Sequence, residues 1–159
     1  MANVKHPFVG NFRVSIDAKQ RIAMPKTMRD TLVKSYGEEA DSVIVTLAMR
    51  QPSIAVYPLS EFNRLMDRLQ ETTELDADTQ SLLMLMSASA RACPIDGQGR
   101  IRLPEDLMAH AGLEKEAYFC GHITRMQIWQ PERWKQFASE TLGAMSEVTV
   151  RAFESIRKA

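Results

Sequence analysis

A carboxylate, a guanidinium and a proline recur in the same order at two places in the chain. Residues Ile16–Pro25 read IDAKQRIAMP, and 79 residues later Ile95–Pro104 read IDGQGRIRLP. An Asp that opens a tight turn accepts hydrogen bonds from backbone N–H groups two or three residues ahead. An Arg four residues after the Asp begins the returning strand and is close enough to pair with it. Each segment can therefore close a turn, and its arginine can also bind an anion.

The residue types leave two roles open for these pairs. In the structural interpretation, Asp17 and Asp96 close their turns and the arginines pair with them. In the functional interpretation, the arginines lie on a basic two-stranded ribbon, a shape that fits the major groove of DNA. More cations surround the first turn, so we expect that turn to meet DNA and the second to be mainly structural. The candidate DNA-binding residues are Arg13, Lys19, Gln20, Arg21, Lys26, Arg100 and Arg102.

The repeated segment belongs to a longer internal duplication. Each copy predicts a strand, a turn, a returning strand, a short helix, two more strands and a helix that begins with aromatic residues. Copies of this size would bury little alone, so we expect them to share one sheet or barrel. The predicted parts are a first repeat over 8–75, a linking helix over 76–89, a second repeat over 90–142 and a C-terminal helix over 143–159.

Charge is distributed unevenly along a chain whose formal net charge is zero. Residues 1–36 contain seven Lys or Arg and two Asp, whereas residues 37–81 contain three Arg and nine acids. Positive charge therefore gathers around the repeated segments, and negative charge gathers on the predicted helices. This pattern favours a basic face that binds a polyanion such as nucleic acid.

Other kinds of site find little support in the sequence. The three histidines stand at no metal-ligand spacing, and the nucleophile and phosphate-loop motifs of common enzymes are missing. Cys93 and Cys120 indicate free thiols, with a disulfide as the alternative. The longest apolar run, Leu82–Met86, is too short to span a membrane, and the chain opens with no secretory signal. We expect no enzyme activity, metal, cofactor or membrane association.

The duplicated Asp-x-x-x-Arg turns, each followed by Pro and a short helix, resemble the MraZ family. The matched aromatic segments Tyr57–Phe62 and Trp129–Trp134 extend the resemblance over most of the chain. Each half of that family is similar to the swapped-hairpin domain of AbrB-type regulators. The resemblance implies an α+β fold in which two such units form a pseudo-symmetric small barrel with helices on the outside.

The same resemblance implies a DNA-binding transcriptional regulator of the bacterial division and cell-wall gene cluster. Such proteins bind tandem repeats upstream of their own gene, form homo-oligomeric rings, and act in the cytoplasm on the nucleoid. The family's DNA contact corresponds to Arg21, with Lys19 and Arg13 beside it. The family usually has Gly before this arginine, where this chain has Gln20, which leaves the type of the first turn open.

Two functions of other classes remain as alternatives. The chain could be an antitoxin-like interaction module whose acidic helices bind another protein, or an enzyme with an unrecognised site. Strongly salt-dependent retention on heparin distinguishes a DNA-binding protein from an enzyme for small substrates.

Overall fold

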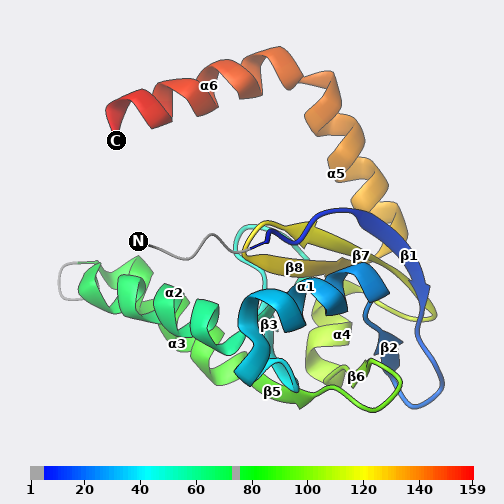
Figure 1. The fold of residues 1–159 in the computed structure, drawn as a ribbon. Coiled ribbons are helices and arrows are strands. Elements are labelled where there is room, and N and C mark those ends of the chain that lie inside the picture. The colour runs from blue at the N-terminus through cyan, green and yellow to red at the C-terminus, as the bar shows by residue number, and fades with distance from the viewer. Residues whose placement is uncertain (1–5, 73–75) are drawn as a thin grey trace.

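The computed structural model describes residues 6–72 and 76–159, and Figure 1 shows their arrangement. The predicted boundary at residue 75 lies outside the described residues. The strands and helices follow the predicted order closely. The first repeat contains β1 (Asn11–Ser15), β2 (Arg21–Ala23), α1 (Lys26–Tyr36), the 3-10 turn η1 (Gly37–Glu39), β3 (Ser42–Leu47), β4 (Ile54–Tyr57) and α2 (Leu59–Thr72).

The second repeat follows the linking helix α3 (Ala77–Ser89), which Asp76 caps by accepting hydrogen bonds from the N–H groups of Asp78 and Thr79. Helix α4 (Glu105–Ala111) is capped at its C-terminus by Gly112 in the left-handed conformation. The elements of this repeat are β5 (Arg91–Pro94), β6 (Arg100–Arg102), α4 (Glu105–Ala111), β7 (Glu116–His122), β8 (Arg125–Trp129) and α5 (Pro131–Gly143), and α6 (Met145–Lys158) follows them.

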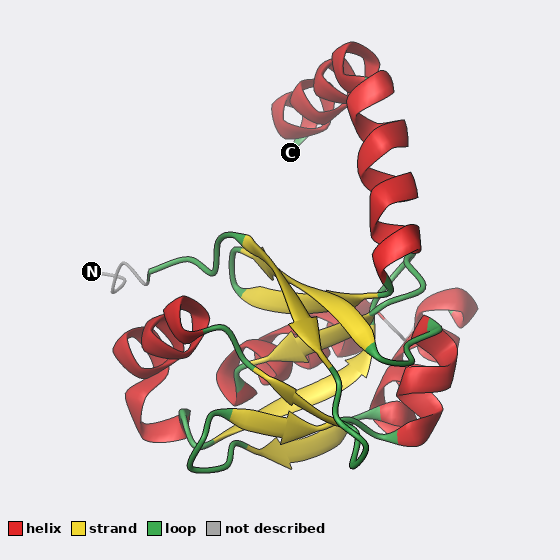
Figure 2. Ribbon diagram, turned by 90° about the vertical axis from the view of Figure 1, so that its right-hand side faces the viewer, coloured by secondary structure: helices red, strands yellow, loops and turns green. Residues whose placement is uncertain are grey.

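The two repeats exchange strands. The larger sheet has six antiparallel strands in the order β1-β7-β8-β4-β3-β5, and Figure 2 shows them curving around the core. The first strand of each repeat pairs with the third strand of the other, β1 with β7 and β5 with β3. The fourth strands, β4 and β8, join the two halves. Neither repeat therefore completes a sheet by itself.

The second strands form a separate two-stranded ribbon, in which β2 lies antiparallel to β6. The sequence predicted that each turn would join two strands paired with each other. That prediction is wrong in its pairing: β1 and β2 share one isolated bridge, Ile16 with Ile22, before β1 continues along β7. The strand exchange separates the two arms of each predicted hairpin, because each arm finds its partner in the other repeat.

One hydrophobic core serves both repeats. Ile22 and Ile101 lie opposite each other on the inner face of the ribbon and are 0% and 1% exposed. Leu32 and Leu107, from the two equivalent helices, are buried in the same cluster as strand residues of both copies. The copies share a core, as their small size suggested.

The fold is a mixed α+β architecture, as predicted. Within the described residues no sheet is closed, so the predicted small barrel is not confirmed. Cys93 and Cys120 are buried free thiols, in agreement with the expectation from the sequence. No helix in the described part of the chain is long and apolar enough to cross a membrane.

Helices α5 and α6 extend away from the sheet (Figure 1). No residue of α6 is buried, although Phe153 and Ile156 are large and apolar, with exposed fractions of 65% and 69%. This helix therefore presents an apolar face to solvent.

Candidate nucleic-acid interface

The first repeated segment forms the predicted closed turn. The carboxylate of Asp17 accepts hydrogen bonds from the N–H groups of Lys19 and Arg21, each at 2.9 Å. Its other oxygen lies 2.7 Å from Nε of Arg21. The Gln20 N–H donates to the Asp17 carbonyl at 2.9 Å, so the turn is fixed by backbone and side chain together.

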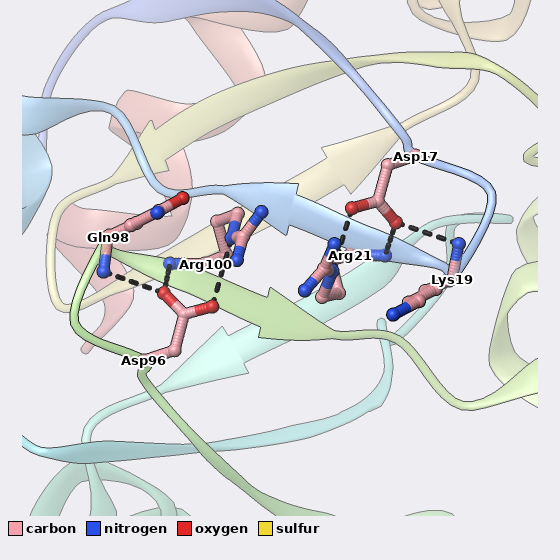
Figure 3. A network of polar contacts seen from close by, with 6 residues as sticks. All are labelled: Asp17, Lys19, Arg21, Asp96, Gln98 and Arg100. Atoms are coloured by element: carbon pink, nitrogen blue, oxygen red, sulfur yellow. Dashed lines mark hydrogen bonds and ion pairs between the residues drawn. The ribbon is translucent and has the colours of Figure 1, made fainter.

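The second segment repeats this arrangement bond for bond. The Asp96 carboxylate accepts from the N–H groups of Gln98 and Arg100 at 2.9 Å, and from Nε of Arg100 at 2.9 Å. Figure 3 shows the two ion-paired turns at opposite ends of the ribbon. Asp17 and Asp96 thus make equivalent hydrogen bonds in the two turns.

The turn hydrogen bonds favour the ionised carboxylates. The N–H of Arg21 lowers the pKa of Asp17, and the N–H of Arg100 lowers that of Asp96. The paired guanidinium of each turn acts in the same direction. Both acids consequently stay charged, and each accepts a hydrogen bond from Nε of its arginine. Within residues 6–72 and 76–159 the outer nitrogens of these two guanidinium groups have no partner, so they are available to a ligand.

Gln20 does not change the type of the first turn. It adopts φ = +64°, in the left-handed region, where the equivalent Gly99 has φ = +78°. A non-glycine residue pays a conformational cost there. The Gln20 side chain reaches Glu105 at the start of α4, with Nε2 3.3 Å from Oε1. The first turn therefore keeps the geometry of the second, under backbone strain.

The outer face of the ribbon carries arginines from both repeats. Arg21 pairs with Arg102, and Ala23 pairs with Arg100. Since Ile22 and Ile101 point into the core, these four residues share the opposite face. The structure thus brings together three of the predicted residues, Arg21, Arg100 and Arg102, on one surface.

Arg13 lies elsewhere. It is on β1, opposite Tyr118 of β7, with Nη2 2.6 Å from Oε2 of Glu116 and its guanidinium over the Tyr118 ring. The hydrogen bond to Glu116 raises the pKa of Arg13 and lowers that of Glu116. The charge of Arg13 is therefore offset by a neighbour, unlike that of the ribbon residue Arg102.

Lys19 is exposed on the first turn, as predicted, but Lys26 is beside the second turn and not the first. It lines a surface hollow together with Arg29, Gln98 and Gly99. Arg29 was not among the predicted site residues. Arg29 follows Lys26 by three positions, and residues at this spacing lie on the same face of a helix. This spacing could have indicated that the two cations act together.

The described residues do not indicate a metal site on this surface. They contain no group of three or more His, Cys, Asp or Glu that could hold a metal ion. What the ribbon face provides is three guanidinium groups, of which those of Arg21 and Arg100 are held by turn carboxylates. Guanidinium groups suit phosphate oxygens and the acceptor edge of guanine.

Comparisons with a family model and with individual known proteins point to the same family. The model of a family described as "MraZ protein, putative antitoxin-like" matches residues 86–155. The protein named "Transcriptional regulator MraZ" of Azotobacter vinelandii is 34% identical over 140 residues, which is 88% of this chain and 90% of that protein. The protein of the same name from Alkaliphilus metalliredigens is 31% identical over 147 residues, covering 92% and 97% of the two chains. The one from Ligilactobacillus salivarius is 35% identical over 133 residues, covering 84% and 87%. With this similarity along most of its length, the chain belongs to the MraZ family.

Proposed function

We propose that this protein is a transcriptional regulator that binds promoter DNA through the outer face of the β2–β6 ribbon. The observation that carries the proposal is the position of Arg21, Arg100 and Arg102 on one face of two strands. Arg21 and Arg102 lie directly opposite each other, so their like charges repel in the free protein. An anionic ligand would relieve this repulsion. The names of the relatives, transcriptional regulators, support the same conclusion.

The finer parts of the proposal follow from the family resemblance. The DNA would be tandem repeats upstream of the protein's own gene, in the division and cell-wall gene cluster, and the protein would act at the nucleoid in the cytoplasm. The interlocked repeats would be AbrB-like swapped-hairpin units. The strand exchange between β1 and β7 and between β5 and β3 supports this relationship.

Assembly into a homo-oligomeric ring would give the binding its strength. A single ribbon offers few cations, so one protomer alone would bind DNA weakly and with strong salt dependence. Repeating the ribbon at a fixed spacing, against repeated DNA boxes, multiplies weak contacts through effective concentration. The exposed apolar side chains of α6, with Phe153 and Ile156 among them, support association with another copy.

A mobility-shift titration with the DNA immediately upstream of the protein's own gene tests the proposal. Arg21→Ala should weaken binding by about 1–3 kcal/mol for each bidentate contact between the arginine and a base that is lost. The loss should be larger in an oligomer that binds DNA with several copies of this residue. Arg68→Ala, which removes an exposed arginine on α2, is the matched control and should bind normally. Gel filtration must show both variants assembled like the unmodified protein. Normal binding by an assembled Arg21→Ala protein would refute the assignment.

A second candidate function is an antitoxin-like interaction with another protein. The description of the matched family favours it, as do the exposed Met84 and Leu85 of α3 beside the acidic helix α2. In that case the purified protein should give no shift with the upstream DNA and should pass through heparin without salt-dependent retention.

A further inference from the structure

The second turn is surrounded by cations that belong to the first repeat. The turn itself, Gly97-Gln98-Gly99, has no cation. A Cβ atom placed on Gly99 would lie 2.8 Å from Nη1 of Arg29, so the Arg29 guanidinium lies against this turn. Lys26 lines the same surface hollow. Helix α1 of the first repeat therefore supplies the cations of the second turn.

The antiparallel ribbon explains this arrangement. Strand β2 begins at the first turn and runs toward the start of β6, which is the second turn. The Met24 N–H, just beyond β2, donates to the Gly99 carbonyl at 2.9 Å. Since Pro25 then starts α1, the first residues of this helix must lie beside the second turn. By the same geometry, α4 starts beside the first turn.

The helix that starts at the first turn has the opposite charge. Glu105 stands at the position in the second repeat that Lys26 holds in the first, and it accepts a hydrogen bond from Gln20. Arg21 and Arg102 lie opposite each other at that end of the ribbon, with Lys19 on the turn. Arg91 lines a hollow there together with Gln20 and Arg102. Arg100, Lys26 and Arg29 lie at the other end, so both ends carry cations that come from different sequence positions.

The charges of Lys26 and Arg29 are not neutralised within the part of the chain described. Ion pairs join other cations to acids, such as Arg13 to Glu116 and Arg91 to Asp106, but none within 4.0 Å involves Lys26 or Arg29 among residues 6–72 and 76–159. Asp30 lines the same hollow without pairing with either of them. Two unpaired cations on one helix face, next to Arg100, make a surface suited to a phosphate group.

We propose that Lys26 and Arg29 form a second phosphate-binding site, so that each protomer contacts the DNA backbone at both ends of its ribbon. The proposal rests on the DNA-binding function proposed above. From the sequence we expect the second turn to be mainly structural. In the present proposal both turns face the nucleic acid instead. The phosphates bound there fix the orientation of the ribbon on the duplex, whereas sequence is read by groups that reach base edges.

The test measures the dissociation constant for the upstream DNA as a function of salt concentration. Each phosphate contact contributes about 0.9 to the slope of log K against log salt. Lys26→Ala/Arg29→Ala should lower that slope by about two for each protomer that contacts the DNA. It should weaken binding to cognate and scrambled DNA by the same factor. The control Lys34→Ala/Arg68→Ala removes two exposed cations at other places on the surface and should leave the slope unchanged.

Lys26→Ala alone gives the same test without risk to folding, because Lys26 is exposed at the start of α1. It should lower the slope by about one for each protomer that contacts the DNA. An unchanged slope in both variants, with Arg21→Ala still defective, would overturn the second site and leave the proposed function intact. If the unmodified protein gives no shift at all, the proposed function itself fails.

Discussion

Arg21 of the first repeat lies directly opposite Arg102 of the second repeat in the β2–β6 ribbon. Residues in this relation have Cβ atoms about 4.5–5.5 Å apart, and like charges there destabilise the strand pair. Arg102 has no acidic partner among the described residues, while Arg21 shares only its Nε with Asp17. This arrangement lowers the folding stability of the free protein, and a bound anion would relieve the repulsion. For this reason we regard it as the best indicator of function in the molecule.

Removing this repulsion should stabilise the protein and weaken DNA binding at the same time. Arg102→Ala should raise the free energy of unfolding by about 0.2–1 kcal/mol at low salt. The gain should shrink as added salt screens the charges. Urea unfolding at low and high salt measures it, with Arg68→Ala as the control for loss of an exposed arginine. A loss of stability at low salt would show that Arg102 is held by attractive contacts instead.

The strained residue in the first turn gives a second prediction. Gln20→Gly should stabilise the protein by up to about 1 kcal/mol, because glycine adopts φ = +64° without steric cost. The exposed hydrogen bond to Glu105, at 3.3 Å, offsets little of this gain.

The matched change at the equivalent position is Gly99→Gln, which should destabilise. It places a side chain at φ = +78° and forces the Arg29 guanidinium to move. Chemical denaturation of both variants measures the difference. Equal effects of the two changes would contradict the equivalence of the turns.

The turn aspartates should make stability fall in acid. Folding lowers the pKa of Asp17 and of Asp96, chiefly through the N–H groups of Arg21 and Arg100. A group with a lowered pKa contributes stability above its unfolded value, about 3.9, and loses it as pH falls through the native value. Asp17→Asn/Asp96→Asn should therefore be less stable than the unmodified protein near pH 6, and the two should converge near pH 2.

Urea unfolding from pH 6 to pH 2 measures this convergence. Asp67→Asn, at an exposed acid of α2 without an ion pair among the described residues, should keep the acid dependence of the unmodified protein. A constant stability difference across the range would mean that the turn carboxylates contribute through shape and not through charge.

Helix α6 should matter for assembly and not for the fold of the protomer. Phe153→Glu/Ile156→Glu should reduce the molar mass measured by light scattering, because both side chains are exposed and apolar. The circular dichroism spectrum should stay unchanged, since no α6 residue is buried. Glu147→Ala on the same helix is the control and should assemble normally. Unchanged mass in the double variant would place the subunit contact on another surface.

Local chemistry could be predicted from the sequence, and pairing between the repeats could not. The hydrogen bonds of Asp17 and Asp96 follow from residues four positions apart, which depend only on the turn. The starts of α1 and α4 follow from Pro25 and Pro104, which directly precede their first residues. Alternating apolar residues indicate which face of a strand is buried, but they do not identify the partner strand.

For that reason the sequence predicts that β2 pairs with β1, whereas it pairs with β6 in the structure. For the same reason the sequence does not indicate that Lys26 and Arg29 lie beside the second turn. Both residues reach the second turn only because the ribbon joins two copies of the motif whose arginines are 79 residues apart in the chain.

Alkylation of a cysteine on the ribbon tests the DNA-binding surface most directly. Ala23 is exposed between the arginines of the outer face, while native Cys93 and Cys120 are buried and should react slowly. In an Ala23→Cys variant, saturating upstream DNA should slow alkylation by a small thiol reagent at least about tenfold, the extent expected if about nine-tenths of the sites are covered. In an Asn63→Cys variant, at an exposed position of α2, DNA should leave the rate unchanged. Slow alkylation at Ala23→Cys is the predicted result. An unchanged rate at that position, in protein shown by mobility shift to be bound, would contradict DNA binding through the ribbon.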